Sequence, residues 1–145
     1  MNDDQGVRDL VAHLLDAVAR GDVDAWVRCW HPDGVWVLPG VGEVRGTDAL
    51  REKFATLRAE YELCVQELLF GWVDVTGDRA TGRWYLRELQ RSRRGTGQEL
   101  LGCYDDAVVR DAGRWVFTER RFWVLYRGPR LLAGDVLRPP PPVAT

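Results

Sequence analysis

Four polar side chains in the second half of the chain are of types that together can move protons. Glu88 and Asp106 are carboxylic acids, and a carboxyl group in apolar surroundings can remove and return a proton near neutral pH. Tyr104 can donate a hydrogen bond to an enolate or phenolate oxygen as negative charge develops on it. Arg120 can hold an anionic substrate group or keep Asp106 ionised. These four residues are the candidate catalytic residues of an acid–base site.

Glu88 belongs to a segment, residues 80–91, whose side chains alternate with the period of a β-strand. On one face it follows an apolar row made of Ala80, Gly82, Trp84 and Leu86. The charges on the other face mark it as the more solvated; it comprises Thr81, Arg83, Tyr85, Arg87 and Leu89. The pattern predicts that Glu88 points inward at the end of the apolar row. A place at a water-filled rim is the alternative.

Tyr104 and Asp106 share a face of the next predicted strand, residues 98–110. The alternate set is also rather apolar and comprises Leu101, Cys103, Asp105, Ala107 and Val109. Burial alone therefore leaves the facing of this strand open. A structural salt bridge is the alternative role for Asp106 and Arg120, and a core position with a satisfied hydroxyl is the alternative for Tyr104.

Tryptophan is the unusual component, with seven residues in a chain of 145. Its flat ring and N–H donor suit a pocket wall that is apolar and also orients a ligand. Most of the seven are expected in the core, and two or three are expected to face a cavity. The predicted substrate-binding residues are Trp36, Leu38, Phe54, Trp84 and Trp123.

The first third of the chain has a helical period. Apolar residues recur every three or four positions over residues 7–20, and Gly21 ends this helix. Asp22 is predicted to cap a short second helix, and Thr47 a third that carries Phe54. Residues 31–34, HPDG, are predicted to form a turn before a short strand at 35–38.

From residue 63 the period changes to two. Strands are predicted at 63–75, 80–91, 98–110 and 115–126, joined by short turns that make neighbours antiparallel. Helices followed by such a meander predict an α+β fold with the helices on one face of the sheet. We expect a pocket domain over residues 1–130 and a Pro-rich C-terminal tail over 131–145.

The bulk properties exclude several classes of partner. A formal net charge of −2 gives no reason to expect a nucleic acid or an acidic membrane surface. The three cysteines are far apart and form no metal-ligand cluster, so we expect buried thiols, no metal and no other cofactor. The N-terminus does not look like a signal peptide and no apolar run is long enough to span a membrane, so a cytoplasmic protein is expected.

Several short motifs, in this order and spacing, are similar to those of SnoaL-like proteins in the nuclear-transport-factor-2-like superfamily. They are ARGDVDAW at 19–26, PDGVW at 32–36, RGTDAL at 45–50, GDRAT at 77–81, GCYDD at 102–106 and AGRWVF at 112–117. The resemblance implies a conical α+β barrel in which three N-terminal helices and a bent sheet enclose a deep pocket. It also implies that the face with Tyr104 and Asp106 lines this pocket. Proteins of this family are commonly dimeric, so the resemblance implies a dimer as well.

The chain departs from the catalytic patterns of these relatives. The isomerases' helix-one tyrosine falls at Leu14 and their catalytic aspartate at about Leu38. The dehydratases' acidic residue and tyrosine fall at Ala19 and Val18, and their strand histidine near Val65 or Gln66. None of these catalytic sets is reproduced intact.

We therefore expect a cofactor-independent enzyme that cyclises, isomerises or dehydrates a hydrophobic, oxygenated small molecule, in secondary metabolism. A binding or accessory protein with the same pocket and no turnover is the first alternative. An association domain is the second. We also expect a homodimer packed through the face that carries Thr81, Arg83, Tyr85 and Arg87, a mixture favoured at interfaces.

Overall fold

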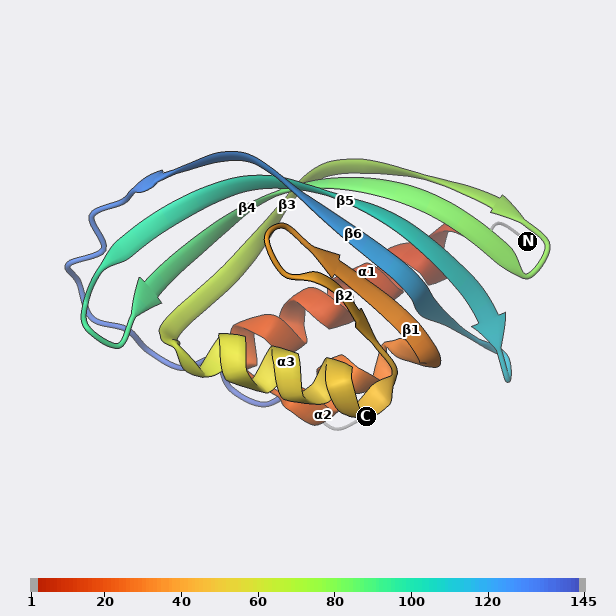
Figure 1. The fold of residues 1–145 in the computed structure, drawn as a ribbon, viewed down its shortest axis with the longest axis horizontal. Coiled ribbons are helices and arrows are strands. Elements are labelled where there is room, and N and C mark those ends of the chain that lie inside the picture. Colours follow the sequence, from red (N-terminus) through yellow and green to blue (C-terminus); the bar gives the residue numbers. More distant parts are fainter. Residues whose placement is uncertain (1–2, 144–145) are drawn as a thin grey trace.

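A computed structural model describes residues 3–143, and within them the helices precede a long antiparallel meander. The helices are α1 (Asp4–Arg20), α2 (Val23–Arg28) and α3 (Thr47–Ala59). The strands are β1 (Trp30–Leu38), β2 (Gly42–Arg45), β3 (Tyr61–Thr76), β4 (Arg79–Ser92), β5 (Gly97–Asp111) and β6 (Arg114–Pro129). The sheet arches over the helices, which lie under its concave side (Figure 1). The predicted α+β class is confirmed.

The six strands form one sheet in the order β2-β1-β6-β5-β4-β3. Strands β3 to β6 pair antiparallel in sequence order, as their short connections predict. The first strand departs from an all-antiparallel sheet, because β1 runs parallel to β6. The chain must cross over through α3 and the meander to bring these two strands together, which local pattern cannot reveal. The sheet is strongly curved but not closed, so the shape is an open cone.

The strand β1 is longer than expected, and the predicted turn at residues 31–34 was wrong. These residues are extended, but the pairing of β1 with β6 shifts between Trp30 and Val35, so they form a bulge within the strand. Gly34 is required there because a Cβ at this position would lie 2.8 Å from Cε3 of Trp30. The short strand β2 was also missed; it folds back on β1 as a hairpin.

The helix boundaries follow capping chemistry at two of three predicted positions. Gly21 ends α1 in the left-handed region at φ 67°, as predicted. The Asp22 side chain accepts a hydrogen bond from Ala25 N at 3.0 Å and caps α2, also as predicted. The predicted Thr47 cap was wrong, because Gly46, at φ 85°, occupies the cap position and Thr47 is already the first helical residue.

Strand alternation decides the facing of the central strands. In β4 the residues from Ala80 to Gln90 are buried at every even position, and Glu88 lies on this inner face as predicted. In β5, Tyr104 and Asp106 are buried while Asp105 is only partly covered. The face that carries Tyr104 and Asp106 is therefore the inner one, which resolves the alternative left open by the sequence.

The outer face of the sheet carries exposed aromatic side chains. Trp72 on β3 and Trp123 on β6 are each about half exposed. Phe70 on β3 stacks on Tyr85 of β4 with ring centroids 4.5 Å apart. The face also holds an ion pair between Arg83 Nε and Asp105 Oδ1 at 2.6 Å. Apolar area of this kind on a sheet is typical of protein contacts.

After β6 the chain continues without helix or strand as far as residue 143 and passes around one end of the sheet toward α3 (Figure 1). Arg91 holds this segment to β4, because its Nη1 donates to Leu132 O at 3.0 Å and to Gly134 O at 2.5 Å. None of the helices in the described chain is long and apolar enough to cross a membrane.

Candidate functional site

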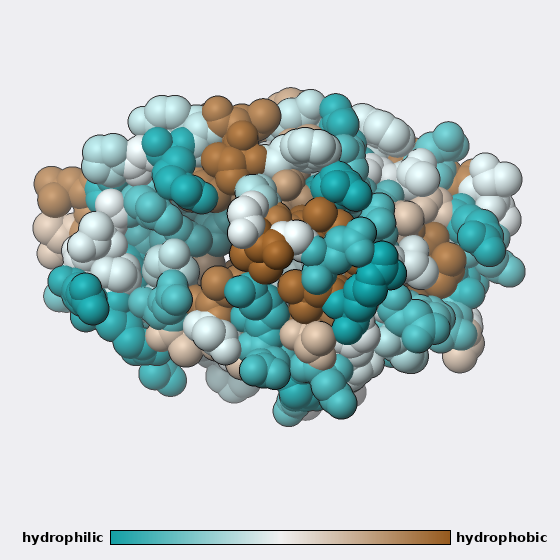
Figure 2. All heavy atoms as spheres, in the orientation of Figure 1, coloured by the Kyte–Doolittle hydropathy of each residue, from teal (hydrophilic) through white to brown (hydrophobic). Residues whose placement is uncertain are grey.

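A cavity of about 220 Å³ lies between the concave face of the sheet, the three helices and the β1–β2 hairpin. Its upper wall is aromatic: Trp26 of α2 stacks on Phe54 of α3 with ring centroids 4.4 Å apart, and Trp36 of β1 lies 4.9 Å from Trp26. Pro39 and Val41 of the hairpin also line the cavity, and Figure 2 shows hydrophobic side chains gathered over this hairpin. The cavity therefore suits a small apolar molecule.

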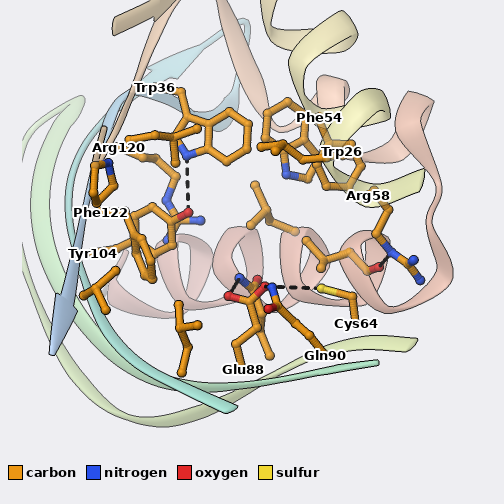
Figure 3. A pocket seen from close by; sticks show the side chains of 18 of the residues that line it. Trp26, Trp36, Phe54, Arg58, Cys64, Glu88, Gln90, Tyr104, Arg120 and Phe122 are labelled. Atoms are coloured by element: carbon orange, nitrogen blue, oxygen red, sulfur yellow. Dashed lines mark hydrogen bonds between the residues drawn. The ribbon is translucent and has the colours of Figure 1, made fainter. Parts of the chain in front are cut away.

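Glu88 lies on the floor of this cavity and is held by three hydrogen-bond donors (Figure 3). Its Oε1 accepts from Gln90 Nε2 at 2.7 Å and from Cys64 Sγ at 3.2 Å. Its Oε2 accepts only from Gln66 Nε2, at 3.3 Å. No arginine or lysine within residues 3–143 forms an ion pair with this carboxylate. Oε2 is thus the oxygen that remains open to a ligand.

Cys64 acts in this cluster as a hydrogen-bond donor rather than as a nucleophile. Burial raises the pKa of its thiol, and the neighbouring Glu88 carboxylate adds to the shift. The thiol therefore keeps its proton at neutral pH, and an S–H group can donate to the carboxylate while a thiolate cannot.

A second polar cluster lies on another wall of the cavity. The hydroxyl of Tyr104 accepts a hydrogen bond from Trp36 Nε1 at 3.2 Å. Burial raises the pKa of Tyr104 to about 12, against the opposing effects of Arg120 and Trp36. The hydroxyl thus keeps its proton, and with Trp36 already donating to its oxygen, that proton is available for an acceptor in the cavity.

The guanidinium of Arg120 lies over the ring of Tyr104, and Arg120 is almost fully buried. Its guanidinium carbon lies 3.8 Å from the ring centroid of Tyr104, and its Nε donates to Asp106 Oδ1 at 2.7 Å. Among the described residues its Nη2 has no hydrogen-bond partner. A buried cation with a free N–H at the cavity wall can bind a ligand oxygen.

Asp106 is the counter-ion of Arg120 and does not line the cavity. It is 5% exposed; burial raises its pKa, and the charge and hydrogen bond of Arg120 oppose this rise. Among the described residues its second oxygen, Oδ2, has no hydrogen-bond partner. Asp106 therefore lies outside the cavity lining, and it forms the salt bridge with Arg120 that the sequence analysis gave as the alternative role.

The other predicted side chains divide between the cavity and other places. Trp36, Leu38 and Phe54 line the cavity, as do Glu88, Tyr104 and Arg120. The placement of Trp84 in the pocket was wrong: it is fully buried in the core, where the guanidinium of Arg8 on α1 lies 5.4 Å from its ring.

The placement of Trp123 was also wrong, because it lies on the outer face. Trp123 is paired with Cys103, whose position in β5 alternates with the inward Tyr104. Its Nε1 donates to Asp105 Oδ2 at 3.0 Å on the outside of the sheet. The adjacent Phe122 takes the inward position and lines the cavity.

Sequence reasoning missed the amides and the thiol that hold Glu88. Gln90 is two residues beyond Glu88 on the same strand face, and Gln66 is its cross-strand partner on β3. Both relations follow from strand period and register, so pairing the two predicted strands was the signal that could have found them.

Within the described residues, no cluster of histidine, cysteine and acidic side chains could hold a metal ion.

Comparison with known proteins identifies the family. The model of the SnoaL-like domain matches residues 1–121. The chain belongs to the SnoaL-like domain family. No sequence among the curated proteins matches it.

Solved structures share the SnoaL-like fold over most of the chain. A Novosphingobium aromaticivorans protein, provisionally described as an aromatic ring hydroxylase, is 25% identical, with a TM-score of 0.82 over 89% of this chain and 94% of its own. Hexachlorocyclohexane dehydrochlorinase LinA-type3 of Novosphingobium barchaimii is 19% identical, with a TM-score of 0.79 over 94% of both chains. A provisionally described scytalone dehydratase of Novosphingobium aromaticivorans is 14% identical, with a TM-score of 0.81 over 97% and 94%.

The SnoaL-like cavity has apolar residues where the resemblance predicts catalytic groups. Leu14, Val18 and Leu38 all line it, at positions matched to the isomerase tyrosine, the dehydratase tyrosine and the isomerase aspartate. Gln66, one of two positions matched to the dehydratase histidine, lines it as well. In this protein the polar groups of the cavity come instead from β3, β4, β5 and β6, and from Arg58 of α3.

Proposed function

We propose that this SnoaL-like domain is a cofactor-independent enzyme in which Glu88 moves a proton on a small, apolar, uncharged molecule that carries an oxygen. The observation that carries the proposal is the Glu88 carboxylate, which lies in an apolar cavity without a cationic partner in the described chain. Its hydrogen-bond donors fix the carboxylate, and they leave Oε2 available to take a proton. A carboxylate fixed beside aromatic and aliphatic walls suits general base catalysis.

The Tyr104 and Arg120 cluster supplies the complementary group. A substrate carbonyl oxygen that accepts from the Tyr104 hydroxyl gains negative charge when the adjacent carbon loses its proton. The hydroxyl and the buried Arg120 cation stabilise that charge without reorganising. Asp106 keeps Arg120 in place and neutralises most of its charge in the resting site, so we give Asp106 a positioning role.

The proposed reaction begins when Glu88 Oε2 removes a proton from the carbon next to the carbonyl, and the C–H electron pair moves into an enolate. Return of the proton to another carbon gives isomerisation. Expulsion of a leaving group, which takes the proton from Glu88, gives elimination. Attack of the enolate carbon on a second carbonyl of the same molecule forms a C–C bond and an alkoxide, which takes the proton from Glu88, and so gives cyclisation. The structural relatives named dehydrochlorinase and dehydratase are named for eliminations, which supports this chemistry.

The charges around Glu88 support an uncharged reacting end of the substrate. Glu88 has no ion-pair partner within residues 3–143 and Arg120 is already paired with Asp106, so an anion placed beside Glu88 meets repulsion, although Arg58 and Arg127 also line the cavity. The aromatic walls favour a flat ring. The family resemblance supports a place in secondary metabolism.

Deuterium exchange tests this proposal without knowledge of the natural substrate. The probe is 2-tetralone, a two-ring ketone whose α-protons exchange slowly in D₂O, and mass spectrometry follows deuterium incorporation. We expect the wild-type protein to accelerate exchange and a Leu38→Trp variant, which fills the cavity, to lose the acceleration. Binding of 2-tetralone without any acceleration by the wild type would overturn the proposal.

A binding protein without turnover is the second candidate. It is favoured by one observation, namely that Leu14, Val18 and Leu38 put apolar side chains at cavity positions where the resemblance predicts catalytic groups. The exchange experiment separates the two candidates, since a binding protein quenches or shifts tryptophan fluorescence with 2-tetralone but leaves its exchange rate at the buffer value.

A further inference from the structure

We propose that the ligand of this SnoaL-like domain is elongated and amphiphilic, with an uncharged end in the cavity and a carboxylate end in a second hollow under the C-terminal segment. The inference rests on the proposed function only in that the uncharged end is the reacting end. A second hollow of about 750 Å³ adjoins the cavity. Its walls are the ends of α1 and α3, the start of β3 and residues 136–139 of the segment after β6.

The two hollows share wall residues. Arg58 of α3 and Tyr61 of β3 line both the cavity and the second hollow, so the two hollows adjoin at these side chains. Arg58 is labelled in Figure 3 on the side of the cavity away from Arg120. A ligand too long for the 220 Å³ cavity would therefore extend past these two side chains into the second hollow.

The two separating side chains differ in freedom. Arg58 is fixed, because it donates to Val18 O at 2.7 Å, Tyr61 O at 2.8 Å and Ala19 O at 3.1 Å. The hydroxyl of Tyr61 forms no hydrogen bond with the rest of residues 3–143, and its side chain is half-buried. We infer that Tyr61 is the side chain that turns aside to let a ligand span both hollows.

Charge gives the ligand a direction. Next to Glu88 the cavity repels an anion, although Arg58 and Arg127 also line it. The walls of the second hollow contain Arg93 and Arg138, and neither has a carboxylate partner in the described part of the chain. The wall residue Glu62 does not compete, because Arg91 pairs with it at 2.6 Å. A ligand with one anionic end is thus oriented with that end outward.

The segment after β6 closes the outer side of the second hollow. Arg91 fixes its first part through Leu132 O and Gly134 O, and Val136, Leu137 and Pro139 then contribute apolar wall. An apolar stem between the two ends of the ligand can contact these side chains. The chemistry that fits the pair of hollows is a linear or branched apolar stem that ends in a carboxylate.

Octanoate and 1-octanol, matched in chain length, are the probes. Their binding is measured by tryptophan fluorescence, which reports on Trp26 and Trp36 in the cavity, and by competition with 2-tetralone. We expect octanoate to compete with 2-tetralone and to bind about 5-fold more tightly than 1-octanol, the size of a partly exposed ion pair. An Arg93→Gln/Arg138→Gln variant should lose this preference. An Arg79→Gln/Arg121→Gln variant, with the same change in net charge away from both hollows, should keep it.

Equal affinities for octanoate and 1-octanol would overturn the inference, as would octanoate binding that leaves 2-tetralone in place. Loss of the preference in both double variants would also overturn it, because it would then reflect net charge alone. Binding of 2-tetralone without accelerated deuterium exchange overturns the proposed function and not this inference, provided that octanoate still competes and still shows the arginine-dependent preference.

Discussion

Replacing Asp106 by asparagine should strongly destabilise the protein. The substitution keeps the shape of the side chain and removes its charge. Arg120 is 1% exposed and donates to Asp106 at 2.7 Å, so the variant leaves a buried cation without its counter-ion. Breaking a buried pair in this way costs about 3–5 kcal/mol, which is a large part of the 5–15 kcal/mol typical of a domain.

Asp105→Asn is the matched control, because the same change is made one residue away on the outer face. Asp105 pairs with Arg83 at 2.6 Å, but the two side chains are 38% and 40% exposed. An exposed pair of this kind contributes far less to stability than a buried one, because solvent screens its charges. Urea unfolding of the wild type and both variants, followed by tryptophan fluorescence at neutral pH, measures how much free energy of unfolding each substitution removes.

The reasoning is refuted if Asp106→Asn and Asp105→Asn lose the same free energy of unfolding. If Asp106→Asn does not fold, the double variant Asp106→Leu/Arg120→Met provides the test. It removes both charges and retains apolar volume, so it should fold and recover most of the lost stability. A double variant that is as unstable as a folded Asp106→Asn, or that also fails to fold, would contradict the account.

Three further predictions concern other parts of the molecule. Tyr104→Phe should lower the rate of deuterium exchange in 2-tetralone about 100-fold, the size typical of losing one donor to a developing oxyanion, and should leave binding nearly unchanged; an unaltered rate would remove Tyr104 from the reaction. The exposed outer face predicts a homodimer, so light scattering should give twice the chain mass for the wild type and a monomer for Trp72→Glu/Trp123→Glu; a wild-type monomer at micromolar concentration would contradict this. Asp22→Ala should cost about 1 kcal/mol at pH 7 and Thr47→Ala much less, since only Asp22 caps a helix. The pKa of Asp22 is lowered by the hydrogen bond from Ala25 N and then by Arg20. The contribution of Asp22 to stability is therefore complete above the ordinary aspartate pKa and is lost as pH falls through the lowered pKa. A loss of stability in Asp22→Ala that stays constant down to pH 2 would contradict this.

The parts of the fold that sequence predicted are those governed by local rules. The period of two in β4 predicted the inward direction of Glu88, and the αL glycine and the aspartate cap predicted the ends of α1 and α2. The failures have a different origin. Residues 31–34 have turn chemistry, but pairing of β1 with β2 and β6 holds them extended around a bulge. That pairing is non-local and leaves no trace in the local pattern.

The site was predicted by residue type better than by position. Glu88, Tyr104 and Arg120 do share the cavity, and the facing of β5 needed the family resemblance or the structure to resolve it. Trp84 and Trp123 show the limit. An inward tryptophan can lie under a helix instead of beside a cavity, and a tryptophan in a strand can belong to the outer face when its neighbour, here Phe122, takes the inward position. The composition gives the number of tryptophans but does not show which of them line the cavity.

The Glu88→Gln substitution tests the central claim most directly. Glutamine retains the size of the side chain and can still bond with Gln90 and Cys64, but it cannot remove a proton. Glu67→Gln, on an exposed position of β3, is the control. The account predicts that Glu88→Gln folds, binds 2-tetralone, and exchanges its α-protons about 100-fold or more slowly than wild type, while Glu67→Gln matches the wild type. A folded Glu88→Gln protein that exchanges deuterium at the wild-type rate would contradict the account.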